Sequence, residues 1–295
     1  MLVGISRIVA ENPSVMTYHG TNTWIVEDED GVAIVDPGPD SEAHASNVLS
    51  ALNGAPVRRI LLTHSHSDHW GNTALLKAMT GAPVLAYRHP IRKGFTPDIP
   101  LDPGTLAGGF KAIHTPGHAA DHLCFQFCTK DKQKILFTGD HVMSWSSSIV
   151  SPPDGDMGDY YRSLELLLER DDDIYLCGHG PMLREPRVLV SGLLSHRRFR
   201  EQTILEELRK QDWDVASLAA KLYHKADRQL QAASQRNVLS HLLKLKEERI
   251  VEELMPGTER HMDAAGPMPD GVTAETGAVA STAHRDSMRR FGLIR

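Results

Sequence analysis

The pattern of apolar residues changes abruptly near residue 185, and this change constrains the fold more than any other feature of the chain. Before it, short apolar runs rich in β-branched residues alternate with turn residues, as in residues 23–26 and 32–35 on either side of an acidic turn. Such runs predict strands, and segments with helical spacing, such as residues 72–79, predict helices between them. Strands mixed with helices indicate an α/β sandwich in which helices cover packed sheets, and we assign it to residues 1–183.

After this point the periodicity is helical. Residues 188–210 and 229–246 carry apolar side chains at helical spacing, and Asp214 is the predicted N-cap of a helix over 215–223. Residues 248–254 predict a short strand or wing. Three helices and a strand are typical of a helix-turn-helix or winged-helix module, so we predict a small helical, winged-helix-like domain over 184–255. Residues 256–295 are rich in Gly, Pro, Ala and polar residues, and we expect them to be disordered except for 291–294.

The charges are distributed unevenly along the chain. Residues 1–183 hold 13 Lys and Arg against 22 Asp and Glu, a net charge of −9, whereas residues 184–250 hold 14 against 9, a net charge of +5. This asymmetry indicates separate roles for the two parts, although a basic segment can also be no more than solvated helix faces. There is no apolar run of about 18 residues, so no membrane partner is expected. Three cysteines and a start that lacks the features of a secretory signal favour a cytoplasmic location.

Four candidate metal ligands lie within six residues, directly after the apolar run 60–62. They are His64, His66, Asp68 and His69. If strand geometry continues past residue 62, His64 and His66 point to the same side, because side chains alternate along a strand. Imidazole nitrogen and carboxylate oxygen are the donors that zinc and similar divalent metals accept. The alternative is a histidine-rich surface patch without a metal.

Three more ligand-type residues each follow an apolar run that predicts a strand. His118 ends the segment 112–118, Asp140 ends the segment 135–140, and His179 lies between two glycines after 174–177. Loops at strand ends are where a rigid scaffold holds functional groups, and a neighbouring glycine allows a close approach of the backbone. A lone histidine is more often structural. Together with the first cluster, however, these three residues complete a set of seven ligands.

The order His-x-His-x-Asp-His, Thr-Pro-Gly-His, Thr-Gly-Asp and Gly-His-Gly-Pro resembles the metallo-β-lactamase superfamily over residues 15–183. That family has an αββα sandwich with a dinuclear metal site at one edge of its sheets. The resemblance implies that one metal is held by His64, His66 and His118. It implies that the second is held by Asp68, His69 and His179, with Asp140 bridging both. The segments 20–26 and 34–38 also resemble the opening hairpin of the family.

Two features narrow the resemblance to a subfamily. Asp121 and His122 follow the Thr-Pro-Gly-His motif, and the Gly-His-Gly-Pro motif leads into a helical module. These features are similar to the lactamase-β-like endoribonuclease family, which joins the sandwich to a C-terminal winged-helix-like domain. Its characterised eukaryotic members cleave single-stranded RNA.

The ligand set predicts a metal-dependent hydrolase that uses a metal-bridging hydroxide. Two Zn²⁺ ions are the expected cofactors, with Mn²⁺ or Fe²⁺ accepted by the same donors, and they would lower the pKa of a bridging water towards neutrality. Asp140 would position the metals, and Asp68 would orient the nucleophile or take its proton. Asp121 and His122 either orient His118 and donate a proton to the leaving group, or form an ordinary polar turn. We expect Cys177 to be a buried thiol and His141 to bind no metal.

Two substrate classes fit this chemistry. The first is single-stranded RNA, whose phosphates would contact cationic side chains of the helical module: Arg197, Arg198, Arg200, Lys221, Lys225, Arg228, Arg236, Lys244 and Lys246. The second is a small acyl substrate, a thioester or lactone, as in the glyoxalase-II-like and lactonase branches of the superfamily. Phe95, Trp145 and residues 146–156 would then line the pocket, and the helical module would shape it or form a homodimer interface. A third hypothesis treats the metals as structural. The sequence leaves the oligomeric state open.

Overall fold

The structure is a computed structural model that describes residues 2–28, 30–224, 230–255 and 282–294. The chain forms two compact units, residues 1–199 and 200–295, and the division falls inside helix α5 (Pro186–Leu208). The first turns of α5 belong to the first unit because Val190, Leu193 and Leu194 pack in its core. No helix in the described part of the chain has the length and apolar character needed to cross a bilayer. The cytoplasmic location stays a prediction.

The first unit contains two sheets. The six-stranded sheet has the order β1 (Ile5–Val9), β2 (Asn22–Glu27), β3 (Val32–Val35), β4 (Val57–Leu61), β5 (Val84–Tyr87) and β6 (Ile99–Leu101). The five-stranded sheet has the order β11 (Ile174–Cys177), β10 (Lys134–Gly139), β9 (Leu123–Cys128), β8 (Phe110–His114) and β7 (Leu106–Ala107).

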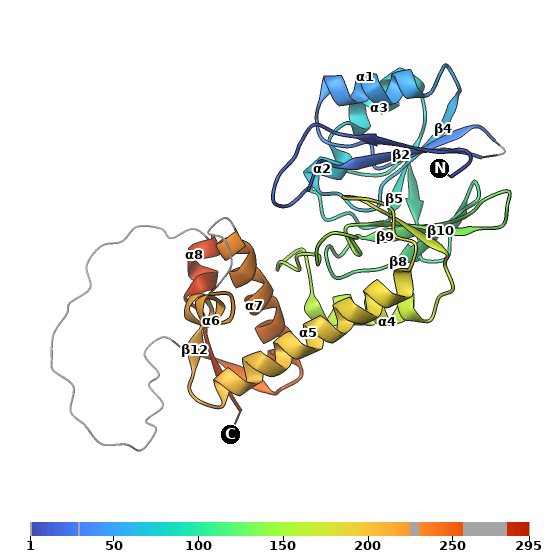
Figure 1. Cartoon of the computed structure of the whole chain (residues 1–295). Coiled ribbons are helices and arrows are strands. Elements are labelled where there is room, and N and C mark those ends of the chain that lie inside the picture. The colour runs from blue at the N-terminus through green and yellow to red at the C-terminus, as the bar shows by residue number, and fades with distance from the viewer. Residues whose placement is uncertain (1, 29, 225–229, 256–281, 295) are drawn as a thin grey trace, which may run out of the picture. The chain divides into compact units, whose positions relative to one another are not determined.

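The sheets pack face to face between layers of helices. Side chains from both sheets, among them Val35, Leu61, Phe125 and Phe137, form one buried apolar cluster. Helices α1 (Glu42–Ala51) and α3 (Thr73–Thr80) cover the outer face of the six-stranded sheet, and α4 (Met157–Leu168) with the start of α5 covers the other sheet (Figure 1). The predicted αββα sandwich is confirmed.

Strand directions bring several loops to the same edge of this sandwich. Strands β3 and β4 run parallel, as do β10 and β11, and β8 and β10 both run antiparallel to β9. The C-terminal ends of the parallel pair within each sheet therefore lie side by side. Short strands with few polar positions suit this arrangement, because both faces of a sheet inside a layered sandwich are covered.

The second unit combines helices with a small sheet. Beyond the end of α5 it contains α6 (Val215–Leu222), α7 (Gln231–Glu247), α8 (Thr282–Ser287) and a sheet of order β12 (Trp213–Asp214), β14 (Arg290–Leu293) and β13 (Val251–Leu254). The Asp214 side chain caps α6 by accepting a hydrogen bond from Ser217 N at 2.8 Å, as predicted. The helical C-terminal region is therefore confirmed, whereas its assignment as a winged-helix module stays a prediction.

The C-terminal segment differs in part from the sequence prediction. Residues 256–281, which we expected to be disordered, lie outside the described residues. Residues 282–287 form α8, which the composition did not predict. Strand β14 pairs with β13 and buries Phe291 completely, so this segment completes the core of the second unit.

Candidate metal centre

All seven predicted ligands lie in segments that follow strands of the first unit. The segment 64–69 follows β4, His118 follows β8, Asp140 follows β10, and His179 follows β11. Three groups of side chains bring ligand atoms within 4.8 Å of one another: His64, His66 and His118; His64, His69 and Asp140; and Asp68, His69 and His179. The structure thus brings all seven residues together at one edge of the sandwich.

One step of the sequence argument is wrong, although the residues still converge. Strand β4 ends at Leu61, so His64 and His66 are not aligned by the alternation of a strand. The chain instead leaves the sheet and turns into the short helix α2 (Ser67–Trp70), with His66 as its N-cap. Asp68 and His69 face the site from this single helical turn.

The first group consists of three imidazoles that point at a common centre. His66 Nδ1 lies 2.9 Å from His64 Nε2 and 2.9 Å from His118 Nε2. On its other side, His118 donates a hydrogen bond from Nδ1 to the carbonyl oxygen of Ile149 at 2.8 Å. Because a carbonyl can only accept, this bond places the proton of His118 on Nδ1 and leaves the lone pair of Nε2 directed at the centre.

The second group combines two imidazoles with a carboxylate. Asp68 Oδ2 lies 3.2 Å from His179 Nε2 and 3.5 Å from His69 Nε2. His179 donates from Nδ1 to the carbonyl oxygen of Gly20 at 3.3 Å, so its Nε2 also presents a lone pair to the site.

Asp140 lies between the two groups. Its Oδ1 is 3.3 Å from His69 Nε2, while its Oδ2 is 3.3 Å from His179 Nε2 and 3.7 Å from His118 Nε2. Oδ2 thus lies near a histidine of each group and Oδ1 lies near His69, so this carboxylate is placed where it would contact ions held by either group. The site is tightly packed around it, because a Cβ atom on Gly178 would lie 2.6 Å from Asp140 Oδ1.

Sequence analysis missed the role of Asp36, a buried carboxylate directly after β3. Its Oδ1 accepts a hydrogen bond from Thr63 N at 2.8 Å, and its Oδ2 accepts from Thr63 Oγ1 at 2.8 Å and from His69 Nδ1 at 2.9 Å. This contact fixes His69 with Nε2 directed at the centre. The available signal was a carboxylate at the end of an apolar strand, the same signal that identified Asp140.

The pKa values show that the carboxylates attract positive charge to the centre. Burial lowers the pKa of His64 well below its usual value and that of His118 to about 4. Burial also acts to lower the pKa of His69 and of His179, but Asp140 and the other nearby carboxylates outweigh this effect. They raise the pKa of His69 well above its usual value and that of His179 to about 9. A divalent cation supplies the positive charge that protons otherwise supply there.

The donor set fits divalent metals. Among the described side chains, His69 Nε2 and Asp140 Oδ1 are buried atoms without a hydrogen-bond partner, and both face the centre. Buried polar atoms normally have partners, so these two indicate a missing group. Imidazole and carboxylate donors in this arrangement are those that zinc, manganese and iron accept.

The ambiguous pair, Asp121 and His122, does not orient His118. The Oδ2 atom of Asp121 accepts hydrogen bonds from Ser65 Oγ at 2.5 Å and from Ile91 N at 3.0 Å. His122 is completely buried, and its Nδ1 lies 2.9 Å from Thr115 Oγ1. Burial holds its pKa well below the usual value, and a neutral side chain without solvent exposure is poorly placed to protonate a leaving group.

Two further expectations concern residues next to the ligands. Cys177 is a buried free thiol outside the three ligand groups, and burial raises its pKa to about 11. His141 is buried, also lies outside these groups, and packs on the ring of Tyr160 with a centroid distance of 4.8 Å.

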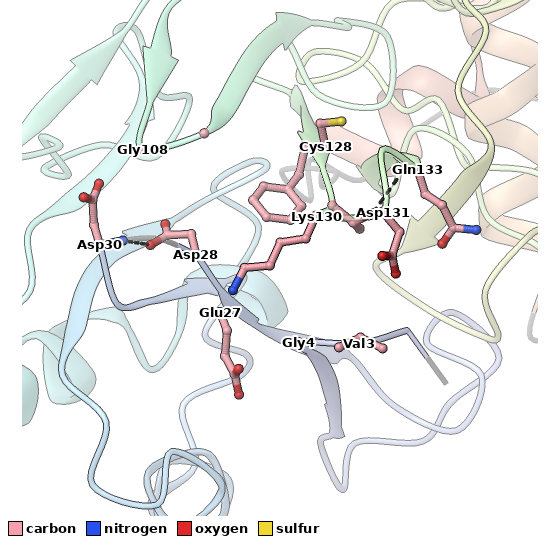
Figure 2. A pocket seen from close by; sticks show the side chains of 13 residues that line it. Val3, Gly4, Glu27, Asp28, Asp30, Gly108, Cys128, Lys130, Asp131 and Gln133 are labelled. Carbon is pink, nitrogen blue, oxygen red and sulfur yellow. Dashed lines mark hydrogen bonds between the residues drawn. The ribbon is translucent and has the colours of Figure 1, made fainter.

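A cavity of about 530 Å³ lies at the opposite edge of the sheets, lined by the turns that join β2 to β3, β7 to β8 and β9 to β10. Figure 2 shows Lys130 extending across it towards Glu27. Strands β3, β8 and β10 begin at this edge and end at the metal centre. The length of the sheets therefore separates this cavity from the candidate ligands.

Comparison with known proteins identifies the family. Residues 16–179 match the sequence model of the Metallo-beta-lactamase superfamily, which is more than half of the chain. The chain belongs to the metallo-beta-lactamase superfamily and is a hydrolase.

Similar proteins differ in how much of their length is matched. The chain is 28% identical over 269 residues to "Beta-lactamase-like protein 2 homolog" of Drosophila melanogaster, covering 83% of this chain and 88% of that protein. It is 27% identical over 208 residues to an atrochrysone carboxyl ACP thioesterase of Passalora fulva, covering 69% of this chain but only 61% of that protein. The chain thus spans less than two thirds of this fungal relative.

Solved structures share the fold. A metallo-beta-lactamase family protein of Thermus thermophilus superposes with a TM-score of 0.71 at 22% identity, covering 86% of this chain and 97% of the other. TTHA1623, solved in a di-iron-bound form, has a TM-score of 0.50 at 26% identity, covering 62% of this chain and 96% of the other.

Proposed function

We propose that this protein hydrolyses thioesters at a dinuclear metal centre. His64, His66 and His118 would hold one ion, Asp68, His69 and His179 the other, and Asp140 would contact both. The convergence of these seven side chains supports the proposal most strongly. When bound, two divalent cations would lower the pKa of a water molecule and polarise the carbonyl of the substrate. Hydrolysis then converts the thioester and one water into a carboxylic acid and a free thiol.

Asp68 is the ligand with the most open carboxylate. Its side chain is 27% exposed, compared with 10% for Asp140. Burial raises its pKa, but His69 and His179 outweigh this effect and lower the value to about 2, so Asp68 is ionised at neutral pH. An ionised and accessible oxygen suits the role of orienting water by accepting a hydrogen bond from it.

An aromatic wall beside the centre supports an acyl substrate. The rings of Tyr18 and Trp145 stack with a centroid distance of 5.1 Å, and Trp145 packs on Gly180, the residue after His179. Tyr18 and Gly180 also line a cavity of about 190 Å³. Tyr18 is 39% exposed, which leaves apolar surface for an acyl group.

Pairing of the basic side chains weakens the case for RNA. Lys225 and Arg228 lie outside the described residues. Six of the other cations already contact groups of their own unit: Arg197 binds Ser147 Oγ at 2.7 Å, Arg198 binds Glu165 at 2.7 Å, Arg200 lies 4.3 Å above the Tyr223 ring, Arg236 pairs with Asp286, Lys244 binds Glu201 at 2.9 Å, and Lys246 binds Glu253 at 2.7 Å. Four of these six, Arg198, Arg236, Lys244 and Lys246, pair with carboxylates, and cations that are already neutralised contribute less to phosphate binding.

A single screen tests the proposal against the RNA alternative. The full chain is assayed with Zn²⁺, Mn²⁺ or Fe²⁺ on pantetheine thioesters of several acyl groups and on single-stranded RNA. We expect thioester hydrolysis that Asp140→Asn abolishes and that Asp98→Asn, a carboxylate change away from the ligands, leaves intact. Cleavage of RNA without thioester hydrolysis would reject the proposal and support the endoribonuclease prediction. A metal content near two ions per active chain, lost in Asp140→Asn, is expected in parallel.

A further inference from the structure

A basic segment follows β5 in a part of the chain that is otherwise acidic. Residues 88–93 contain Arg88, His89, Arg92 and Lys93, whereas residues 1–183 as a whole carry a net charge of −9. Arg88 is neutralised by Asp102, with Nη2 lying 2.5 Å from Oδ2. Arg92 and Lys93 are exposed, and no carboxylate in the described ranges lies within ion-pair distance of either. Their charge is therefore available to a ligand.

Hydrogen bonds to two buried side chains hold this segment against the metal loop. Ile91 N donates to Asp121 Oδ2 at 3.0 Å, and Arg92 N donates to Ser65 Oγ at 3.2 Å. Ser65 in turn donates to the same oxygen of Asp121 at 2.5 Å, and it lies between His64 and His66. Asp121 is only 2% exposed. The buried carboxylate, which the hydrolytic chemistry does not require, thus fixes the backbone of the basic segment beside the candidate ligands.

The guanidinium of Arg92 is also held in place. It lies 3.9 Å from the centroid of the Trp70 ring, and Trp70 directly follows His69 and packs edge-on against Phe95 at 5.7 Å. A cation–π contact orients the guanidinium without neutralising it, so its N–H groups stay able to bind an anion in a bidentate manner. An oriented arginine next to a lysine is an arrangement suited to phosphate.

We propose that Arg92 and Lys93 bind the phosphate of the carrier arm of the substrate. This inference rests on the proposed function: a thioester on a phosphopantetheine arm carries its acyl group at one end and a phosphate at the other. Tyr18 and Trp145 lie beside Gly180, the residue after His179, whereas Arg92 lies against Ser65 and Trp70 of the metal loop. With the acyl group on the aromatic pair and the carbonyl at the metal centre, the arm would extend along the segment that carries Arg92 and Lys93. They act as specificity residues and take no part in bond breaking.

Two thioesters with the same acyl group provide the test, one on phosphopantetheine and one on pantetheine. In the double variant Arg92→Gln/Lys93→Gln we expect KM for the phosphorylated substrate to rise about 10- to 100-fold, because charge-assisted hydrogen bonds are lost. We expect kcat to stay unchanged, as should both constants for the pantetheine thioester. Lys130→Gln, an exposed lysine at the opposite edge of the sheets, is the matched control and should change neither substrate.

Direct binding separates failure of this inference from failure of the proposed function. Free phosphopantetheine should bind the wild-type protein more tightly than pantetheine, and the double variant should lose this difference whether or not the thioester is hydrolysed. Equal affinities in the wild type, or an unchanged preference in the double variant, would overturn the inference. A thioester with a carboxylate on its acyl group provides the third arm. If the double variant impairs only that substrate, the anion belongs to the acyl part and the assignment to the carrier arm is wrong.

Discussion

Asp36→Asn is the substitution that tests the metal centre most directly without touching a ligand. Asp36 accepts three hydrogen bonds, from Thr63 N, from Thr63 Oγ1 and from His69 Nδ1, at 2.8 to 2.9 Å. Asparagine has nearly the same shape but replaces one accepting oxygen with a donating NH₂ group. The folded backbone should therefore persist, but the three hydrogen bonds that Asp36 accepts cannot all form in the variant.

Either orientation of the new amide is unfavourable. If its NH₂ group faces His69, Nδ1 must accept and the proton moves to Nε2, the atom that points at Asp140, where it blocks metal binding. If its oxygen faces His69, the NH₂ group meets the donor Thr63 N, and an unsatisfied buried donor costs about 1–3 kcal/mol. Since a bound metal requires a free Nε2 lone pair, the metal-bound protein must adopt the second orientation, and its cost predicts that metal affinity falls about 10- to 100-fold.

Competition with a chromophoric chelator measures this change. The dissociation constants for Zn²⁺ should rise in Asp36→Asn, while thermal unfolding of the metal-free protein shows how much of the effect comes from stability. Asp98→Asn is the control, because Asp98 also accepts a backbone hydrogen bond, from Val84 N at 2.8 Å, but is not among the ligand groups. Metal affinities in Asp36→Asn equal to those of the wild type would refute the role assigned to Asp36.

Three further outcomes are expected. Gly178→Ala should abolish tight metal binding, measured by metal content after dialysis, because its Cβ would lie 2.6 Å from both Asp140 Oδ1 and His69 Cε1. A chelator should lower Tm in calorimetry by roughly 5–10 °C if free metal was at about 100 times Kd, and an unchanged Tm would count against metal binding. Glu253 should stabilise the fold in a pH-dependent way: contact with Arg289 lowers its pKa to about 2, so its contribution is present above the ordinary value of 4.5 and is lost as the pH falls towards 2. Glu253→Gln should flatten this dependence in unfolding titrations, whereas an unaltered pH profile would show that the contact contributes nothing.

Local sequence patterns predicted the parts of the structure that depend on local chemistry. The acidic turn between residues 26 and 32 gave the β2–β3 hairpin, and Gly81 ends α3 in a left-handed conformation that glycine tolerates. Helix α6 begins at the predicted cap, Asp214. Ligand-type residues after apolar runs were also recognisable, because strand ends carry functional groups in layered folds.

Features that depend on tertiary packing were missed. Ser41 is the N-cap of α1 and Asp156 is the N-cap of α4, and each side chain accepts a hydrogen bond from the backbone N–H three residues later. The sequence analysis assigned neither segment to a helix. The exact course of the chain between Leu62 and His66 was predicted incorrectly, because whether a strand continues depends on its neighbours in the sheet. The role of Asp36 was missed for the same reason: only the fold brings β3 beside the ligand loop.

Substrate specificity in this chain must come from loops and not from the centre itself. Four of the seven ligands, His64, His69, Asp140 and His179, are buried, and a Cβ atom on Gly178 would clash with two ligands. Two other segments combine exposure with fixed contacts to the centre: the loop containing Tyr18, joined to His179 through Gly20 O, and the basic segment containing Arg92, joined to the metal loop through Ser65. One is aromatic and the other cationic, and they meet the site at different residues, His179 and Ser65. Under the proposed function, a thioester on a phosphorylated carrier arm would satisfy both segments, because it is apolar at its acyl end and anionic at its phosphate end.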